Sequence, residues 1–120
     1  MSIFEQICKD NDITPYYYDE EFADRHFGGT LKRTAGGAAV IVGNKDKYIF
    51  IDRNITRRAQ RYVEAHELGH ILLGHLDKRS SKEHEKCFET EADIFAAVFT
   101  AMEIYEQYKN GGRRGKQQNV

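Results

Sequence analysis

The chain has 120 residues, of which 40% are hydrophobic and 31% are charged, with 18 Lys plus Arg against 19 Asp plus Glu. This length predicts one domain with its own hydrophobic core. The near-neutral charge argues against direct binding of nucleic acid or of an anionic membrane. No stretch reaches the roughly 18 apolar residues of a membrane-spanning helix, and the first residues lack the pattern of a signal peptide. Two cysteines without CxxC spacing, Cys8 and Cys87, favour a reducing cytoplasm.

Short elements are expected in the first quarter of the chain. Residues 2–11 place apolar side chains at helical spacing, with Ser2 as an N-cap. Pro15 ends that helix, and the tyrosine-rich residues 16–20 then favour an extended segment. Residues 20–27 carry one or two helical turns before a pair of glycines.

Three β-like segments follow, at residues 30–34, 38–42 and 47–51, and the last of them is aromatic and β-branched. Residues 43–46, which read Gly-Asn-Lys-Asp, form a hairpin signal between the second and third segments. We therefore expect a small antiparallel three-stranded sheet.

The hydrophobic period then becomes helical for residues 55–73, which Asn54 or Thr56 can cap and Gly74 can end. A charged connector leads to a second long helix over about residues 83–109, with apolar side chains at three- and four-residue steps. The expected fold class is α+β, with the sheet packed on the first of these helices and the second long helix beside it.

We expect residues 1–110 to form a single compact domain. Residues 111–120 have nothing to bury and are expected to form a disordered basic tail. Arg113, Arg114 and Lys116 in this tail could touch an acidic partner, but a solvated tail is the simpler interpretation.

The first long helix contains the sequence VEAHELGHILLGH, in which His66 and His70 are four residues apart with Glu67 between them. Residues four apart lie one above the other on a helix, so the two imidazoles can meet at one point, while Glu67 is rotated about 100° to one side. This HExxH pattern is typical of a zinc site in which the glutamate is the base for the attacking water. Gly69 costs about 1 kcal/mol of helix stability relative to Ala, which favours a functional reason for its place beside the site.

A catalytic zinc ion takes a third protein ligand and leaves one position open. The side chains considered for this ligand are His75, His84, Cys87, Glu89, Glu91 and Asp93. Glu89 and Asp93 share a face of the second helix, so Glu89 can ligate the metal while Asp93 accepts a hydrogen bond from the far nitrogen of a zinc histidine. His75 lies past the end of the first helix and Glu91 on another side of the second, so Glu89 is preferred.

The segments HELGHILLGH, at 66–75, and ETEADIFAA, at 89–97, together resemble the ImmA/IrrE-type metallopeptidases, whose pattern is a HELGH helix and then a helix reading E-x-x-A-[ND]-x-F-A. The resemblance covers roughly residues 38–100. It includes the thermolysin-like (gluzincin) arrangement, in which a glutamate about twenty residues after the second histidine is the third ligand and an aspartate one turn later orients a zinc histidine. Glu89 lies 19 positions after His70, so the resemblance implies these roles for Glu89 and Asp93.

The resemblance is incomplete in one place. Relatives commonly continue the second motif with a proline, whereas residues 95–102 here read FAAVFTAM, so the second helix is expected to continue toward Tyr108. Many relatives also carry a DNA-binding or C-terminal domain, for which we expect no room in this chain. The resemblance therefore leaves the partner open.

The predicted function is that of a zinc-dependent endopeptidase with one Zn²⁺ per chain. His66, His70 and Glu89 are the predicted ligands, and Glu67 takes a proton from the attacking water and passes it to the leaving amine. The resemblance implies a specific protein substrate in the cytoplasm, such as a helix-turn-helix repressor that regulates transcription of a mobile element or a stress response. No direct nucleic-acid or membrane partner is expected.

Attack on an amide carbonyl develops negative charge that a Tyr or His could stabilise. The residues available for this role are Tyr105, His75, Tyr62 and the tyrosines at 16–18. The sequence does not choose between Tyr105 and His75, and the tyrosine run is more simply explained by strand packing.

Two other functions are weighed. A zinc-binding regulator or toxin–antitoxin component could act by protein binding without proteolysis, although such a protein has no need of the base Glu67. A structural zinc site would be closed and four-coordinate, with Cys87 as the fourth ligand. On a helix, however, Cys87 points away from Glu89, two residues later.

Overall fold

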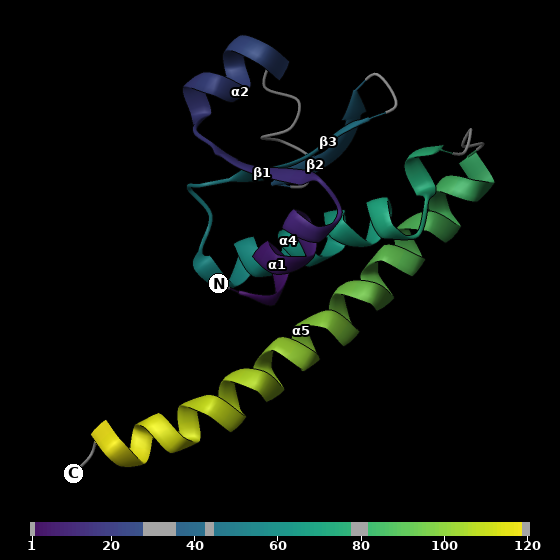
Figure 1. The fold of residues 1–120 in the computed structure, drawn as a ribbon. Coiled ribbons are helices and arrows are strands. Elements are labelled where there is room, and N and C mark those ends of the chain that lie inside the picture. Colours follow the sequence, from purple (N-terminus) through teal and green to yellow (C-terminus); the bar gives the residue numbers. More distant parts are fainter. Residues whose placement is uncertain (1, 28–35, 43–44, 78–81, 119–120) are drawn as a thin grey trace.

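The computed structural model describes residues 2–27, 36–42, 45–77 and 82–118. Figure 1 shows the arrangement of the described elements, which form the α+β class expected from the sequence. In chain order they are α1 (Ile3–Asp10), β1 (Ile13–Tyr18), α2 (Glu20–Phe27), β2 (Gly37–Val42), β3 (Asp46–Asp52), α4 (Arg57–Leu72), the 3-10 turn η1 (His75–Asp77) and α5 (Lys82–Gln118). The three strands form one sheet in the order β1-β3-β2.

The sheet is mixed, so the prediction of an antiparallel sheet is wrong for one of its two pairings. β2 and β3 pair antiparallel, whereas β1 runs parallel to β3, with Ile13 opposite Lys47 and Tyr18 opposite Asp52. Parallel strands need a long connection, and here the chain passes through α2 and β2 on its way from β1 to β3. Such a long-range pairing leaves no local signal in the sequence.

The edge strand β1 replaces the expected first strand. Residues 30–34, where that strand is predicted, lie outside the described residues. β1 instead uses the tyrosine-rich segment that the sequence predicts to be extended, and it begins earlier, at Ile13. Pro15 is accommodated because β1 pairs only with β3 among the described strands, and a proline at a sheet edge need not donate to a neighbour.

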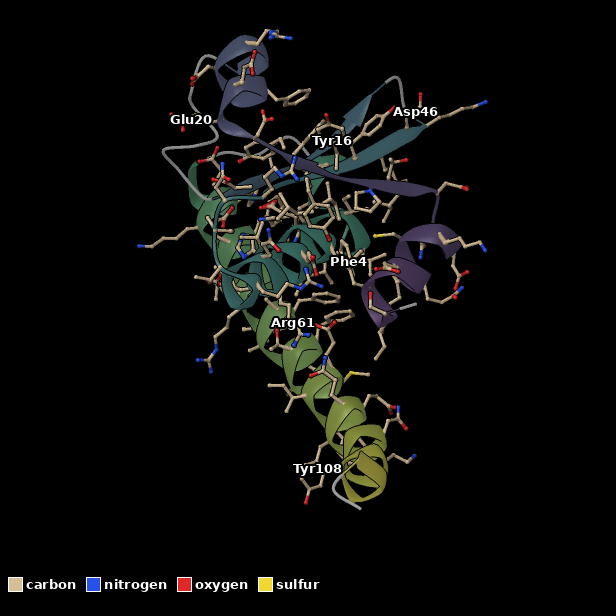
Figure 2. All side chains as sticks on the ribbon, turned by 90° about the vertical axis from the view of Figure 1, so that its left-hand side faces the viewer. Phe4, Tyr16, Glu20, Asp46, Arg61 and Tyr108 are labelled. Carbon is tan, nitrogen blue, oxygen red and sulfur yellow. The ribbon has the colours of Figure 1, made fainter. Side chains whose placement is uncertain are left out.

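One face of the sheet packs on α4, which lies between the sheet and α5 (Figure 1). Alternate residues of β3, Ile49 and Ile51, are fully buried on this face, as the two-residue period of a strand requires. The core cluster draws on five elements and comprises Phe4, Cys8, Ile13, Ile49, Ile51, Val63, Ala65, Leu68, Ile71, Ala96 and Phe99. Figure 2 shows Phe4 of α1 inside this body and Tyr108 of α5 far outside it.

The opposite face of the sheet carries an aromatic layer beneath α2. The ring centroid of Phe22 in α2 lies 4.9 Å from that of Tyr16 and 6.3 Å from that of Phe50, and Tyr48 extends the layer at 6.1 Å from Phe50. Aromatic pairs at such distances stabilise beyond the area that they bury. The sheet is thus covered on both faces, and β2 remains at its edge.

The helix α4 begins with an N-cap and ends at a glycine, as the sequence predicts. Thr56 rather than Asn54 is the N-cap, since its Oγ1 accepts a hydrogen bond from the N–H of Ala59 at 3.1 Å. At the other end Gly74 has a φ of +73°, a left-handed conformation that glycine adopts readily. The N–H of Gly74 donates to the carbonyl of Ile71 at 3.1 Å, so the chain turns back toward the helix.

The helix α5 is longer than predicted, because it continues past Lys109 to Gln118. Its 37 residues span about 55 Å, and Figure 1 shows that its C-terminal part extends well beyond the sheet and α4. The domain boundary at residue 110 stays a prediction, although residues 111–118 are helical here. Among the described helices, none is both long and apolar enough to cross a membrane.

A buried carboxylate joins β1 to α4. Glu64 is only 3% exposed, and its Oε2 accepts hydrogen bonds from the Tyr17 hydroxyl at 2.5 Å and from Arg57 at 3.2 Å. Burial and the contact with Glu64 raise the pKa of Tyr17, so the hydroxyl keeps its proton and donates. Burial, helped by the negative charge of Glu64, also raises the pKa of the free Cys8 thiol to about 12, which makes that cysteine unreactive.

Replacing Tyr17 with Phe removes the donor and leaves the buried Glu64 with one partner fewer. We expect the free energy of unfolding to fall by about 1.5–3 kcal/mol, the range for a hydrogen bond to a charged group. Urea unfolding followed by circular dichroism measures this change.

Tyr16→Phe is the matched control, since the neighbouring Tyr16 ring packs on Phe22 and Phe50. It should change the free energy of unfolding by less than about 0.5 kcal/mol. Equal losses in the Tyr16 and Tyr17 variants would contradict a specific role for the contact with Glu64.

Candidate metal centre

Three side chains from two helices converge beside the core. His66 and His70 lie on one face of α4, with their Nε2 atoms 3.1 Å apart, as the four-residue helical step predicts. Glu89 reaches the same point from α5, where one carboxylate oxygen lies 3.0 Å from His66 Nε2 and the other lies 3.1 Å from His70 Nε2. Two ligands of one tetrahedral zinc ion, each at 2.0–2.1 Å, would lie about 3.3 Å apart. The observed separations therefore suit three ligands of a single ion.

The pattern of donors and acceptors also favours a cation at this point. The outer nitrogen of each ring, Nδ1, faces a polar partner, His75 for His70 and Asp93 for His66. With protons on these outer nitrogens, both Nε2 atoms present lone pairs to each other and to the Glu89 carboxylate. Three acceptors then meet without a hydrogen between them, which is unfavourable unless a positive ion binds there.

Asp93, one turn after Glu89 on α5, lies behind His66. Its Oδ1 is 3.0 Å from His66 Nδ1, although that N–H is not well aligned with the oxygen. The same oxygen accepts a hydrogen bond from the Tyr62 hydroxyl, and this contact raises the pKa of Tyr62 to about 12. Asp93 is thus fixed between Tyr62 and His66, next to the ring that it was predicted to orient.

A second support lies behind His70. His70 Nδ1 is 2.9 Å from His75 Nδ1, and His75 Nε2 is 2.9 Å from an oxygen of Glu91. The His75 ring is 5% exposed and stacks on Phe88, with centroids 4.2 Å apart and planes at 13°. Because Glu91 is an acceptor, His75 donates to it from Nε2 and accepts from His70 at Nδ1. This chain of contacts keeps the Nε2 of His70 unprotonated.

The turn after α4 explains how His75 reaches His70. Leu73 is the C-cap of α4 and Gly74 follows it in the left-handed conformation. In this type of helix end, the residue after the glycine commonly packs on the residue three positions before the cap. Those two residues are His75 and His70. A Gly-His pair at the end of an HExxH helix is therefore the signal that could have revealed the contact.

The close approach of α5 to α4 depends on Gly69. A Cβ at this position would lie 3.0 Å from Cδ1 of Phe95 and 3.1 Å from its Cβ and Cγ, nearer than the roughly 3.5–4.0 Å of favourable carbon contacts. Without that side chain, Phe95 packs directly on the backbone of α4. Glu89 and Asp93, which share a helix with Phe95, are thereby brought to the histidines.

Glu67 lies beside the histidine pair with its carboxyl group next to β2. It is 6% exposed, it accepts a hydrogen bond from the backbone of Ala39, and its ligand atom lies within 4.8 Å of those of His66 and His70. Burial raises the pKa of Glu67 to about 7; His66 opposes this shift and Glu89 adds to it. A pKa near neutrality suits a group that must both take up and release a proton.

The proposed oxyanion donors do not gather at the cluster. Tyr105 follows Glu89 by 16 positions on α5, which is about 24 Å along the helix axis, so it cannot reach this point. His75 lies behind His70 and uses both ring nitrogens. Tyr62 borders the cluster but donates to Asp93. The structure therefore supports neither Tyr105 nor His75 in that role.

Two other residues considered as ligands lie on the first turns of α5. His84 and Cys87 are both exposed, and neither belongs to the group formed by His66, Glu67 and His70. The convergent cluster is therefore complete without a cysteine ligand.

An HExxH helix with a carboxylate beside it from a second helix is the arrangement of a metallopeptidase-like domain. Residues 12–104 match the family Peptidase M78, described as the IrrE N-terminal-like domain. The chain belongs to this family, which is of the zinc metallopeptidase type. This result confirms the ImmA/IrrE family predicted from the two sequence motifs. No curated protein and no solved structure matches the chain.

The raised pKa of Glu67 predicts how stability changes with pH. Between the ordinary value of 4.5 and about 7, the folded chain holds a proton here that the unfolded chain has released. Stability therefore falls as pH rises through this window, by up to about 3 kcal/mol. We expect Glu67→Gln to remove this part of the pH dependence in the metal-free protein.

Urea unfolding of both chains in a chelating buffer, at about pH 5 and about pH 8, measures the effect. The gain in stability from Glu67→Gln should be larger at the higher pH, because wild type must then keep a buried charge. An equal gain at the two pH values would show that the pKa of Glu67 is not raised.

Proposed function

We propose that the chain is a zinc-dependent endopeptidase that cuts a specific protein. The observation that carries this proposal is the meeting of His66 Nε2, His70 Nε2 and the Glu89 carboxylate at one point, 3.0 to 3.1 Å from one another. The carboxylate of Glu89 is 61% exposed, so the cluster borders solvent, and a substrate can approach it.

Zn²⁺ fits this donor set, because two imidazole nitrogens and one carboxylate leave one of four positions open, as in catalytic zinc sites. When bound, the ion would lower the pKa of a water molecule and polarise the carbonyl of the substrate. His66 and His70 would hold the ion through Nε2 and Glu89 through its carboxylate. Asp93 and the His75–Glu91 pair would keep the two rings in place.

Glu67 is proposed to carry the proton. It lies one residue after His66, about 100° round the helix, and its hydrogen bond with Ala39 holds it beside the ligands rather than among them. From there its carboxylate can accept a proton from the attacking water and return it to the leaving amine. Its pKa of about 7 makes both transfers accessible near neutral pH.

The edge strand β2 supports a polypeptide substrate. β2 lies at one end of the strand order among the described strands, and its residue Ala39 contacts Glu67. An extended peptide can add to a sheet edge through main-chain hydrogen bonds, and at this edge it would pass the proposed proton carrier. That the substrate is a cytoplasmic helix-turn-helix repressor of a mobile element or stress response rests on the family resemblance and is part of the proposal.

The alternative is a zinc-binding regulator or toxin–antitoxin component that acts by protein binding without proteolysis. Glu67 favours catalysis over this alternative, because a buried carboxyl group with a pKa near 7 destabilises a protein that has no use for it. A closed structural zinc site is less favoured still, since Cys87 is exposed.

Removing Glu89 should abolish tight metal binding. We expect one zinc per wild-type chain by elemental analysis after dialysis. For Glu89→Ala we expect a loss of affinity of more than about 100-fold, beyond the effect of residues that only support a ligand. Glu106→Ala is the control, because Glu106 lies 17 positions further along the same helix, about 26 Å away. Zinc retained in full by Glu89→Ala would overturn the proposed ligand set.

Zinc affinity also measures how much the contact behind His70 contributes. Glu91→Gln replaces the carboxylate that holds His75 with a neutral amide. Zinc affinity, measured by competition with a chelating dye, is expected to fall by roughly 10- to 100-fold, less than for Glu89→Ala. A loss as large as that of Glu89→Ala would make Glu91 a ligand instead.

Proteolysis is tested by co-expressing the chain with candidate helix-turn-helix repressors and identifying fragments by mass spectrometry. Wild type should yield a defined cut, and Glu67→Gln should keep its zinc but cleave more slowly by about 10²–10⁴-fold. If both chains inactivate a repressor without producing fragments, the protein acts by binding and the non-proteolytic alternative holds.

A further inference from the structure

The helix α5 is apolar on two opposite faces. Its inner face enters the core through Phe88, Ala92, Phe95, Ala96 and Phe99. Its outer face carries a second apolar stripe, which consists of Ile94, Val98, Ala101, Tyr105 and Tyr108. Ile94 lies two residues from both Ala92 and Ala96, about 200° round the helix. A helix that only covered its own domain would be polar on that side.

The outer stripe has the spacing of a coiled-coil seam. Its five residues follow one another at steps of four, three, four and three, an average of about 3.5. Met102 and Ile104 flank the seam on its two sides. Among the described residues, these large apolar side chains of α5 are more than half exposed: Ile94 60%, Val98 56%, Met102 55%, Ile104 58%, Tyr105 62% and Tyr108 79%.

The exposed area of the stripe and its flanking residues is close to that of one side of a protein interface. Large side chains offer on the order of 200 Å² each when fully exposed, so the six together expose on the order of 700 Å² at these fractions. The largest apolar patch on a typical monomer is about 300–600 Å². A standard interface buries about 800 Å² on each partner. The four large side chains of the stripe itself account for on the order of 500 Å² of this, and together with the flanking Met102 and Ile104 the surface exceeds what a monomer usually exposes and approaches what a stable dimer needs.

The stripe also continues beyond the body of the protein. The family match ends at residue 104, whereas Tyr105 and Tyr108 extend the seam past it. Figure 1 shows this part of α5 projecting away from the other elements, and Figure 2 shows Tyr108 near its free end. A lone helical segment of this length is marginal in water, so a second helix along it would stabilise it.

We propose that the outer stripe of α5 pairs with the same stripe of a second copy of this chain, with the two helices antiparallel. Centred on Ala101, this pairing sets Tyr108 of each copy against Ile94 of the other, and Tyr105 against Ala97. Large side chains then meet small or aliphatic ones, whereas a parallel pair would set tyrosine against tyrosine.

Charge favours the same direction. The first part of α5, residues 82–93, is acidic on balance, with five Asp and Glu against Lys82 and Lys86, and the sequence after Tyr108 is basic, with Lys109, Arg113, Arg114 and Lys116. Antiparallel pairing brings the basic end of each helix alongside the acidic part of the other. In a parallel pair, like charges would face each other.

The dimer leaves the metal centre accessible. Asp93 precedes Ile94 by one residue, so it points about 100° away from the seam, and Glu89 lies further round. The inference does not rest on the proposed peptidase function, because the seam itself lies on the outer face of α5.

Sedimentation equilibrium of the full chain, from about 1 to about 100 µM, tests the proposal. Wild type should sediment as a dimer in this range. Val98→Glu and Tyr105→Glu each place a charge in the seam and should raise the dissociation constant by roughly 100-fold or more. Asn110→Glu adds the same charge on the other side of α5 and should leave the dimer intact. Circular dichroism checks that each variant keeps its fold.

The direction of pairing is tested by cysteine cross-linking in a Cys87→Ser background. A mixture of Ile94→Cys and Tyr108→Cys chains should form a disulfide between the two variants, and neither variant should cross-link to itself. Self-linking of each variant would overturn the antiparallel arrangement. A wild-type chain that is monomeric at about 100 µM, or a dimer that survives both seam substitutions, would overturn the interface itself.

Discussion

The contact between Gly69 and Phe95 sets the distance between α4 and α5, and the geometry of the metal centre depends on that distance. One stretch of α5 supplies the polar contacts of the centre, since Glu89 and Asp93 meet His66 of α4 and Glu91 meets His75 of η1. Because a helix moves as a rigid unit, a shift of a few tenths of an ångström at Phe95 would lengthen all of these contacts together. The glycine therefore acts on the whole centre although it touches no metal ligand.

The two histidines of the pair are held in different ways, although their side chains are similarly buried, 13% exposed for His66 and 11% for His70. His66 lies next to the carboxylate of Asp93, which is 56% exposed and stays solvated. The position behind His70 is buried, since the residue there, His75, is 5% exposed, and a carboxylate in that place would be a buried charge with a large desolvation cost. A neutral imidazole, His75, fills that place and passes the contact outward to Glu91, which is 56% exposed. Both rings are thus fixed without burying a second charge near Glu67.

The parts predicted from the sequence are those that depend on local periodicity. The four-residue spacing of His66 and His70 places both on one face of α4, and the same spacing places Glu89 and Asp93 on one face of α5. In the structure these four residues lie together. The pairing of His75 with His70 follows from no helical period, because a left-handed glycine directs the chain there. The parallel pairing of β1 was missed because 34 residues separate Ile13 from its partner Lys47, and no local pattern encodes such a partner.

The order of the elements along the chain makes the contacts of the candidate metal centre local and those of the sheet long-range. The residues from His66 to Asp93 lie on two successive helices joined by a short connection, so their contacts close a small loop. The pairing of β1 with β3 must close a longer one, and contacts between distant residues form more slowly. The helical hairpin can therefore hold its three donor groups together before the sheet docks. Glu67 acquires its buried surroundings only when β2 packs on α4, so its raised pKa depends on the docked sheet and not on the helical hairpin alone.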